Sequence, residues 1–238
     1  MSKLKVYCLP YAGGSKSVYN DWISKYSDVA EIVPIEYNGH GELFCEPFYN
    51  SGDEAANDIC KRIMADKPEN YAVFGHSMGS AIALLVVSKL EKMYSCKPKV
   101  ILVGGMRPPH LKYKDEKLLH LPKDEMMKKV FSLGQTDAEI MNEPELIDIL
   151  YDIFCADLKI DEEINSAESI SKLTIPMICM TGSEDDEAPE EDMREWQSYT
   201  DGSFYFKSFI GDHFFPFNVS DFAPFFREQL EKADSGKL

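Results

Sequence analysis

Short apolar runs alternate with amphipathic segments along most of the chain. The apolar runs predict strands near residues 4–9, 30–37, 71–74, 100–103, 176–180 and 204–209. Runs of this length suit strands that are buried on both faces of a sheet. Between them, helical spacing of apolar residues occurs near 53–66, 80–93, 190–199 and 220–232. Alternating strands and helices predict an α/β fold with a mostly parallel sheet and helices on both faces.

The alternation stops between about residues 107 and 169, where helical patterns at 122–127 and 145–150 have no strand between them. We therefore expect a single domain of residues 1–238 with a helical insertion at about 107–169 that forms a lid over the site. Apolar side chains near and within the insertion either line an adaptable pocket or pack the lid helices against the body. These side chains are Met106, Met126, Met127, Phe131, Met141 and Phe154.

The segment Gly75-His76-Ser77-Met78-Gly79 joins an apolar strand to a helix that begins with small residues. A G-x-S-x-G turn in this context is typical of a nucleophile elbow, in which strained backbone lifts the serine hydroxyl above the sheet. Side chains at either flanking glycine would crowd such a turn. We predict that Ser77 is a catalytic nucleophile. The alternative is a structural turn with a buried serine.

A serine nucleophile needs a base, and the base needs an acid that orients it. In the α/β-hydrolase fold both follow the serine, with the acid before the histidine. Among the histidines after Ser77, only His213 also follows a plausible acid at the end of a strand. We predict His213 as the base and Asp185 as the acid. Glu184 and Asp186 lie in the same turn and stay open as alternatives.

An oxyanion hole needs two backbone N–H groups directed at the developing negative charge. One is expected from Met78, the residue after the nucleophile. The other is expected from the loop after the first strand, Pro10-Tyr11-Ala12-Gly13-Gly14-Ser15. Paired glycines allow the backbone of this loop to approach a ligand closely. We predict Ala12 as the second donor.

Taken together, these segments resemble the type II thioesterases that accompany nonribosomal peptide and polyketide synthases. The resemblance spans almost the whole chain and rests on residues 9–15, 75–79, 182–185, Trp196 and 211–215. It implies an α/β-hydrolase fold and hydrolysis of acyl groups from the phosphopantetheine arm of a peptidyl or acyl carrier protein. It also implies a triad of Ser77, Asp185 and His213, with oxyanion donors at Ala12 and Met78.

Two positions depart from the pattern of that family. The family usually shows Pro-Gly-Arg-Gly after its second strand, where this chain has Asn38-Gly39-His40-Gly41. The acid is usually followed by proline, where this chain has Asp186. The second departure keeps Asp186 as an alternative acid.

The composition is that of one catalytic domain. The chain has 238 residues, 44% of them hydrophobic, and a formal charge of −16, which argues against a nucleic-acid partner. We see no signal peptide and no apolar run long enough for a membrane span, so we expect a soluble cytoplasmic protein. The six cysteines have no metal-like spacing and are expected to be reduced and mostly buried.

The proposed chemistry requires no metal ion and no organic cofactor. A carboxylesterase or acyltransferase on the same fold is an alternative function. A hydrolase-like binding protein is another, although that class has usually lost a member of the triad.

The insertion also has a marked charge split. Residues 107–129 contain seven basic and four acidic side chains, whereas residues 137–168 contain eleven acidic side chains and one lysine. Carrier proteins of the resembled pathways are commonly acidic around the pantetheine attachment point. Electrostatic complementarity would steer such a partner to the basic half. We therefore predict docking over Lys112, Lys114 and Lys117.

Overall fold

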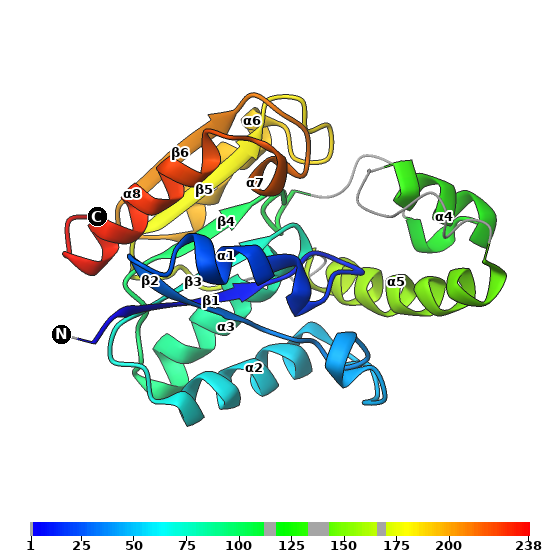
Figure 1. Cartoon of the computed structure of the whole chain (residues 1–238), viewed down its shortest axis with the longest axis horizontal. Helices are drawn as coiled ribbons and strands as arrows, with labels where there is room; N and C mark the ends of the chain where they lie inside the picture. Colours follow the sequence, from blue (N-terminus) through cyan, green and yellow to red (C-terminus); the bar gives the residue numbers. More distant parts are fainter. Residues whose placement is uncertain (1, 112–117, 133–142, 166–169) are drawn as a thin grey trace.

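A six-stranded sheet forms the centre of the molecule. The structure, a computed structural model, describes residues 2–111, 118–132, 143–165 and 170–238. The strand order is β2-β1-β3-β4-β5-β6, and all neighbours are parallel (Figure 1). The strands are β1 (Leu4–Leu9), β2 (Ala30–Pro34), β3 (Tyr71–His76), β4 (Ile101–Gly104), β5 (Met177–Gly182) and β6 (Phe204–Phe209). The predicted parallel sheet is confirmed.

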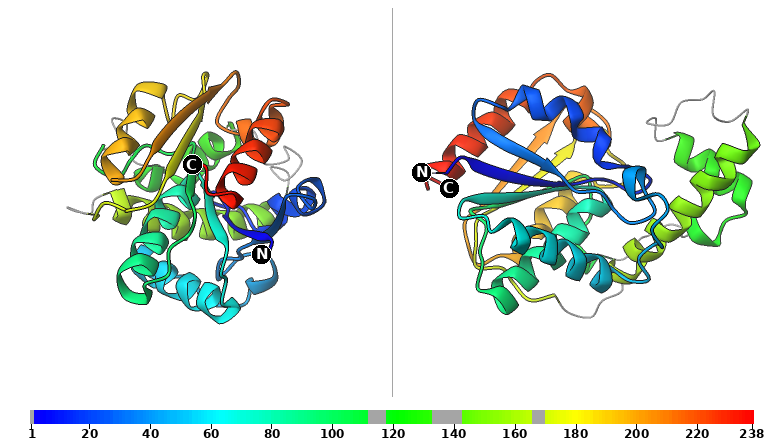
Figure 2. Two further views of the ribbon diagram at one scale, coloured as in Figure 1. Left: turned by 90° about the vertical axis from the view of Figure 1, so that its left-hand side faces the viewer. Right: turned by 60° about the horizontal axis from the view of Figure 1, so that its bottom comes forward.

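Helices cover both faces of this sheet (Figure 2). One face carries α1 (Asn20–Lys25), α7 (Phe215–Asn218) and α8 (Phe222–Asp234). The other face carries α2 (Gly52–Asp66), α3 (Met78–Tyr94), α6 (Glu190–Met193) and the 3₁₀ helix η5 (Arg194–Tyr199). The described residues also form the 3₁₀ helices η1 (Lys16–Tyr19), η2 (Gly41–Leu43) and η3 (Leu118–His120).

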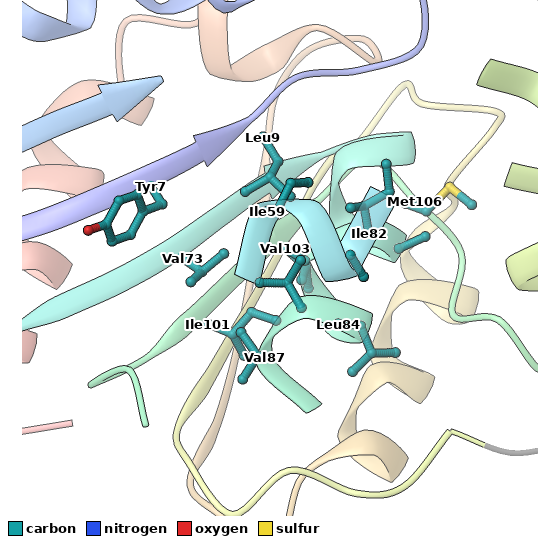
Figure 3. Close-up of a cluster of buried hydrophobic side chains, with 14 of the residues drawn as sticks. Tyr7, Leu9, Ile59, Val73, Ile82, Leu84, Val87, Ile101, Val103 and Met106 are labelled. Carbon is teal, nitrogen blue, oxygen red and sulfur yellow. The ribbon is translucent and has the colours of Figure 1, made fainter. Parts of the chain in front are cut away.

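Alternate residues of the central strands face opposite layers, as the period of two in a strand requires. Side chains from β1, β3 and β4 pack with α2 and α3 in the cluster drawn in Figure 3, which includes Tyr7, Leu9, Val73, Ile101 and Val103. Their neighbours along the strands pack against the helices of the opposite face. No residue of β3, β4 or β5 is exposed. This explains why those strands read as continuous apolar runs in the sequence.

Besides η3, the described residues between β4 and β5 form two α-helices, in the region where the sequence predicted a helical insertion. They are α4 (Lys123–Ser132) and α5 (Pro144–Asn165), and they project beyond the carboxyl ends of the strands (Figure 1). A small apolar cluster joins them and contains Leu121, Met126, Met127, Val130 and Phe154. The far end of α5 returns to the main core, where Ile160 and Ile164 pack with residues of α2 and α3.

Several predicted boundaries differ from those in the structure. The strand expected at 30–37 ends at Pro34, although the N–H of Ile35 still donates to the Cys8 carbonyl at 2.9 Å. The single helix expected at 190–199 is α6 followed by η5. The short helices α1 and α7 were not predicted, because six and four residues are too few to show a clear helical period.

All six cysteines are free thiols. Cys8, Cys60 and Cys179 are buried, and burial raises the pKa of each thiol, that of Cys60 to about 12. Cys45 is exposed, and Cys96 and Cys155 are partly exposed, so the prediction of mostly buried thiols holds for three of the six. In the ranges that the structure describes, no helix is long and apolar enough to cross a bilayer.

Candidate active site

The predicted site residues gather at the carboxyl edge of the sheet. β1 lies between β2 and β3, so the chain order reverses beside β1, and ligands of open α/β sheets bind at such a point. A cavity of about 430 Å³ opens there. Its described lining includes Ala12 after β1, Ser77 and Met78 after β3, and His213 after β6.

Ser77 occupies a strained turn between β3 and α3. Its backbone angles are φ 53° and ψ −129°, which a residue with a side chain rarely adopts. Its N–H donates a 2.8 Å hydrogen bond to the carbonyl of Gly104 at the end of β4. The neighbouring strand therefore holds the turn in place.

The flanking glycines are required by close packing of the backbone. A Cβ atom on Gly75 would lie 2.2 Å from the carbonyl oxygen of Gly79, and one on Gly79 would lie 2.3 Å from that of Leu9. The buried hydroxyl of Ser80 adds a second brace, accepting from Gly104 N at 3.0 Å and lying 2.9 Å from the Gly75 carbonyl oxygen. Ser80 could not be predicted from the sequence, since a serine in a small-residue helix gives no distinct signal.

His213 is paired with Asp185. The His213 Nδ1 atom lies 3.0 Å from Asp185 Oδ2. The other carboxylate oxygen of Asp185 accepts from the N–H groups of Glu187 and Ala188 at 3.0 and 3.1 Å. Asp185 is 4% exposed, whereas Glu184 and Asp186 are exposed. Of the three acids that the sequence left open, the structure brings Asp185 to the histidine.

A second histidine lies beneath the first. The ring of His76 is fully buried, with its centroid 5.2 Å from that of His213. Burial, with a smaller effect of His213, holds the pKa of His76 well below its usual value. His76 is therefore neutral and adds no fixed positive charge below His213.

Arg107 ties the acid loop to the end of β4. Its Nε atom lies 3.0 Å from Asp192 Oδ2 in α6, and Nη2 donates to the carbonyl of Asp186 at 3.3 Å. The side chain also contributes to the cavity wall. Arg107 thus fixes the loop that carries Asp185, a function that the sequence analysis did not assign.

The loop after β1 forms a tight turn from Tyr11 to Gly14. Gly14 N donates to the Tyr11 carbonyl at 2.9 Å, and Gly13 has φ +77°, the geometry of a type II turn. Such a turn leaves the N–H groups of its two central residues, Ala12 and Gly13, outside its own hydrogen bond. Gly13 N donates to Asp157 Oδ2 at 2.7 Å, while Ala12 lines the cavity.

Met78 begins α3, where N–H groups have no acceptor within the helix. It lines the same cavity as Ala12. The two residues predicted as oxyanion donors therefore reach one cavity from adjacent strands, because β1 pairs with β3.

Apolar side chains of the insertion complete the cavity wall, namely Leu118, Val130, Phe154 and Leu158. Met106 and Phe154 line this cavity, in agreement with the interpretation that the apolar side chains form an adaptable pocket. Met126, Met127 and Phe131 instead belong to the cluster that packs α4 against α5. Met141 lies outside the described residues.

Comparisons with known proteins agree along nearly the whole chain. A family model described as a thioesterase domain matches residues 4–230. The thioesterase PikA5 of Streptomyces venezuelae is 28% identical over 219 residues, which cover 90% of this chain and 76% of that protein. The medium-chain S-acyl fatty acid synthase thioesterase of Rattus norvegicus is 28% identical over 217 residues, which cover 89% and 81%.

Solved structures of similar proteins also include thioesterases. RedJ, a thioesterase from the prodiginine biosynthetic pathway in Streptomyces coelicolor, superposes with a TM-score of 0.86 at 27% identity. The match covers 97% of this chain and 90% of that one. The parallel sheet and its helices therefore form an α/β-hydrolase fold, as the sequence predicted.

Proposed function

We propose that this enzyme receives its acyl group on the phosphopantetheine arm of a carrier protein. The chain belongs to the thioesterase family and is therefore a hydrolase of acyl thioesters. The enzyme would clear stalled or wrongly loaded acyl groups in a nonribosomal peptide or polyketide pathway. A solved structure similar to this chain, ClbQ, comes from a pathway of nonribosomal peptide and polyketide synthases, which supports a carrier protein as the partner.

One observation carries the mechanism: Ser77, His213, Ala12 and Met78 line one cavity, and the Nδ1 atom of His213 is paired with Asp185. Asp185 holds the proton on Nδ1, so that Nε2 accepts the proton of the Ser77 hydroxyl. The serine oxygen attacks the thioester carbonyl, and the N–H groups of Ala12 and Met78 stabilise the resulting oxyanion.

The carbon–sulfur bond then breaks. The proton held on His213 passes to the sulfur, which leaves as the free thiol of the arm, and Ser77 carries the acyl group as an ester. Next, His213 takes a proton from water, and the resulting hydroxide attacks the ester carbonyl. The same proton returns to Ser77, and the acid product is released.

The apolar wall of the cavity suits an acyl chain. Val130, Phe154 and Leu158 come from α4 and α5, and together with Ser77 they line a space of about 430 Å³, which is within the usual range for small-molecule sites. Because these side chains belong to the insertion, we expect acyl preference to depend on α4 and α5 more than on the sheet.

A panel of matched substrates tests this proposal. The same acyl group is presented on a carrier protein, on coenzyme A and on a small synthetic thiol, and kcat/KM is compared. We expect the carrier substrate to be preferred, and Ser77→Ala to abolish turnover of all three. Equal efficiency on coenzyme A and carrier would contradict the carrier as the natural partner, while leaving the thioesterase chemistry intact.

The relative from animal fatty acid synthase favours a second candidate, the carrier of a fatty acid synthase. The same panel separates the two when it includes fatty acyl, aminoacyl and polyketide carriers. The predicted docking lysines, Lys112, Lys114 and Lys117, lie outside the described residues. Their role stays a prediction: reversal to glutamate should slow only the carrier substrate, more so at low salt.

A further inference from the structure

A second buried aspartate lies beside the oxyanion turn. Asp157 belongs to α5 and is 2% exposed. Its Oδ2 atom accepts the N–H of Gly13 at 2.7 Å and lies 3.0 Å from Nε2 of His40. One carboxylate oxygen thus joins three segments that are far apart in sequence: the turn after β1, the loop after β2, and the insertion.

His40 faces an acceptor at each ring nitrogen. Nδ1 lies 3.0 Å from the carbonyl oxygen of Asn38, and Nε2 lies 3.0 Å from Asp157. A carbonyl and a carboxylate can only accept, so both contacts are hydrogen bonds only when both nitrogens carry a proton. The geometry therefore selects the imidazolium form of His40.

The electrostatic surroundings of His40 agree with this charge. Burial alone would lower the pKa of His40, but the hydrogen bond and charge of Asp157, aided by the Asn38 carbonyl and by Glu36, outweigh it and raise the pKa above 6.5. The Tyr37 ring packs edge-on against His40, with its centroid 5.8 Å away, and Arg62 from α2 donates through Nη1 to the Glu36 carbonyl.

The Phe154 side chain of α5 also packs against the turn. A Cβ atom on Gly13 would lie 2.4 Å from the ring of Phe154, so this ring would have to move for any larger residue, and the φ of +77° itself favours glycine. We propose that Asp157 and His40 are positioning residues that set the geometry of the oxyanion turn, so that the turn is competent only while α5 is seated on it. This inference rests on the oxyanion role proposed for Ala12.

The physical reason lies in the two peptide planes that meet at Ala12. The Ala12 N–H belongs to the Tyr11–Ala12 plane, which the bond from Gly14 N–H to the Tyr11 carbonyl holds. The bond from Gly13 N–H to Asp157 holds the Ala12–Gly13 plane, so both planes are fixed relative to each other. His40 holds the carboxylate from the other side and balances its charge. When His40 loses its proton, one ring nitrogen faces an oxygen without a hydrogen between them, and the positive charge that balances the carboxylate is lost.

The test measures hydrolysis of a small acyl thioester, so that it does not depend on any carrier protein. The variants are Asp157→Asn and His40→Gln, and the matched control is Asp152→Asn, an exposed acid on the same helix. Misplacement of one donor should lower kcat about tenfold to a hundredfold in both variants, with KM changed less than about twofold. The double variant should lose little more than either single one, because both act through the same contact.

The pH profile separates positioning from a merely structural role. In the intact enzyme kcat should fall as the pH rises above the ordinary range of histidine, and His40→Gln should lack this alkaline fall, since glutamine does not titrate. Melting temperatures of the variants identify any loss that is due to unfolding. The proposal is overturned if Asp157→Asn matches the control in kcat, or if the alkaline fall persists in a folded His40→Gln enzyme. Failure of Ser77→Ala to abolish turnover would instead overturn the proposed mechanism itself.

Discussion

His213 with Asp185 and His40 with Asp157 are both buried histidine–aspartate pairs with a nitrogen–oxygen distance of 3.0 Å. They differ in what surrounds the pair. His213 lines the cavity, and Asp185 is held by N–H groups of its own loop. His40 has an acceptor at each nitrogen, and Asp157 is bound to a distant turn. The first arrangement suits proton transfer, whereas the second suits a fixed charge that holds segments together.

The largest expected effect is a loss of activity when an amide replaces the carboxylate of Asp185. Asp185→Asn should lower kcat about 10⁴-fold, because an amide favours the wrong tautomer of His213. Its melting temperature should change little. The matched control is the exposed neighbour, Asp186→Asn, which should retain nearly full activity. Equal and small losses in both variants would mean that another carboxylate orients His213.

The second prediction concerns the contribution of the His40–Asp157 pair to the stability of the fold. Asp157→Ala should lower the free energy of unfolding by about 3 kcal/mol, since removal of one partner leaves a buried charge and a buried N–H without an acceptor. Urea unfolding measures this change, with Asp152→Ala on the same helix as the control. A loss no larger than that of the control would show that His40 carries no charge in the folded enzyme.

The third prediction concerns the pH dependence of the His40 pair. The pKa of His40 is raised in the folded state, so its contribution to stability is complete below about pH 6.5 and is lost as the pH rises through the folded value. The difference in unfolding free energy between the intact enzyme and His40→Gln should therefore shrink at alkaline pH. An NMR titration in which His40 ionises at or below its ordinary pKa would refute this.

The smallest effect is expected for an exposed pair. Arg227 and Asp28 also form an ion pair, but their side chains are 34% and 67% exposed. Water and salt screen such contacts. Asp28→Asn should leave both kcat and the melting temperature unchanged within error. A clear drop in melting temperature would show that burial is not what distinguishes the ion pairs of this protein.

Local patterns predicted most of the fold and the strained turn that carries Ser77. The strand before Ser77, the glycines around it and the small-residue helix after it lie in one short stretch, so the elbow could be predicted without knowledge of any distant contact. In the α/β-hydrolase fold the acid precedes the base along the chain, and this order favoured His213 among the histidines that follow Ser77. The choice among Glu184, Asp185 and Asp186 required the burial of side chains in the turn, which sequence spacing does not determine.

The second pair could not be predicted. Asp157 is 144 positions from Gly13 and 117 positions from His40. It is also one of eleven acids within residues 137–168, a composition that indicates a solvated surface. His40 did give a signal, as a departure from the usual arginine of the family. Its meaning depends on the packing of α5, which no local pattern encodes.

The distribution of thiols makes the seating of α5 measurable by reaction kinetics. Cys8, Cys60 and Cys179 are buried with raised pKa values, so alkylating reagents meet few thiolates there. Cys155 is partly exposed and lies on α5, two residues before Asp157. In a background that carries Cys45→Ser and Cys96→Ser, because Cys96 is also partly exposed, the alkylation rate of Cys155 would follow how often α5 moves away from the turn. Saturation with a substrate analogue should slow that reaction, so the rate constant of alkylation would report how firmly α5 stays on the turn.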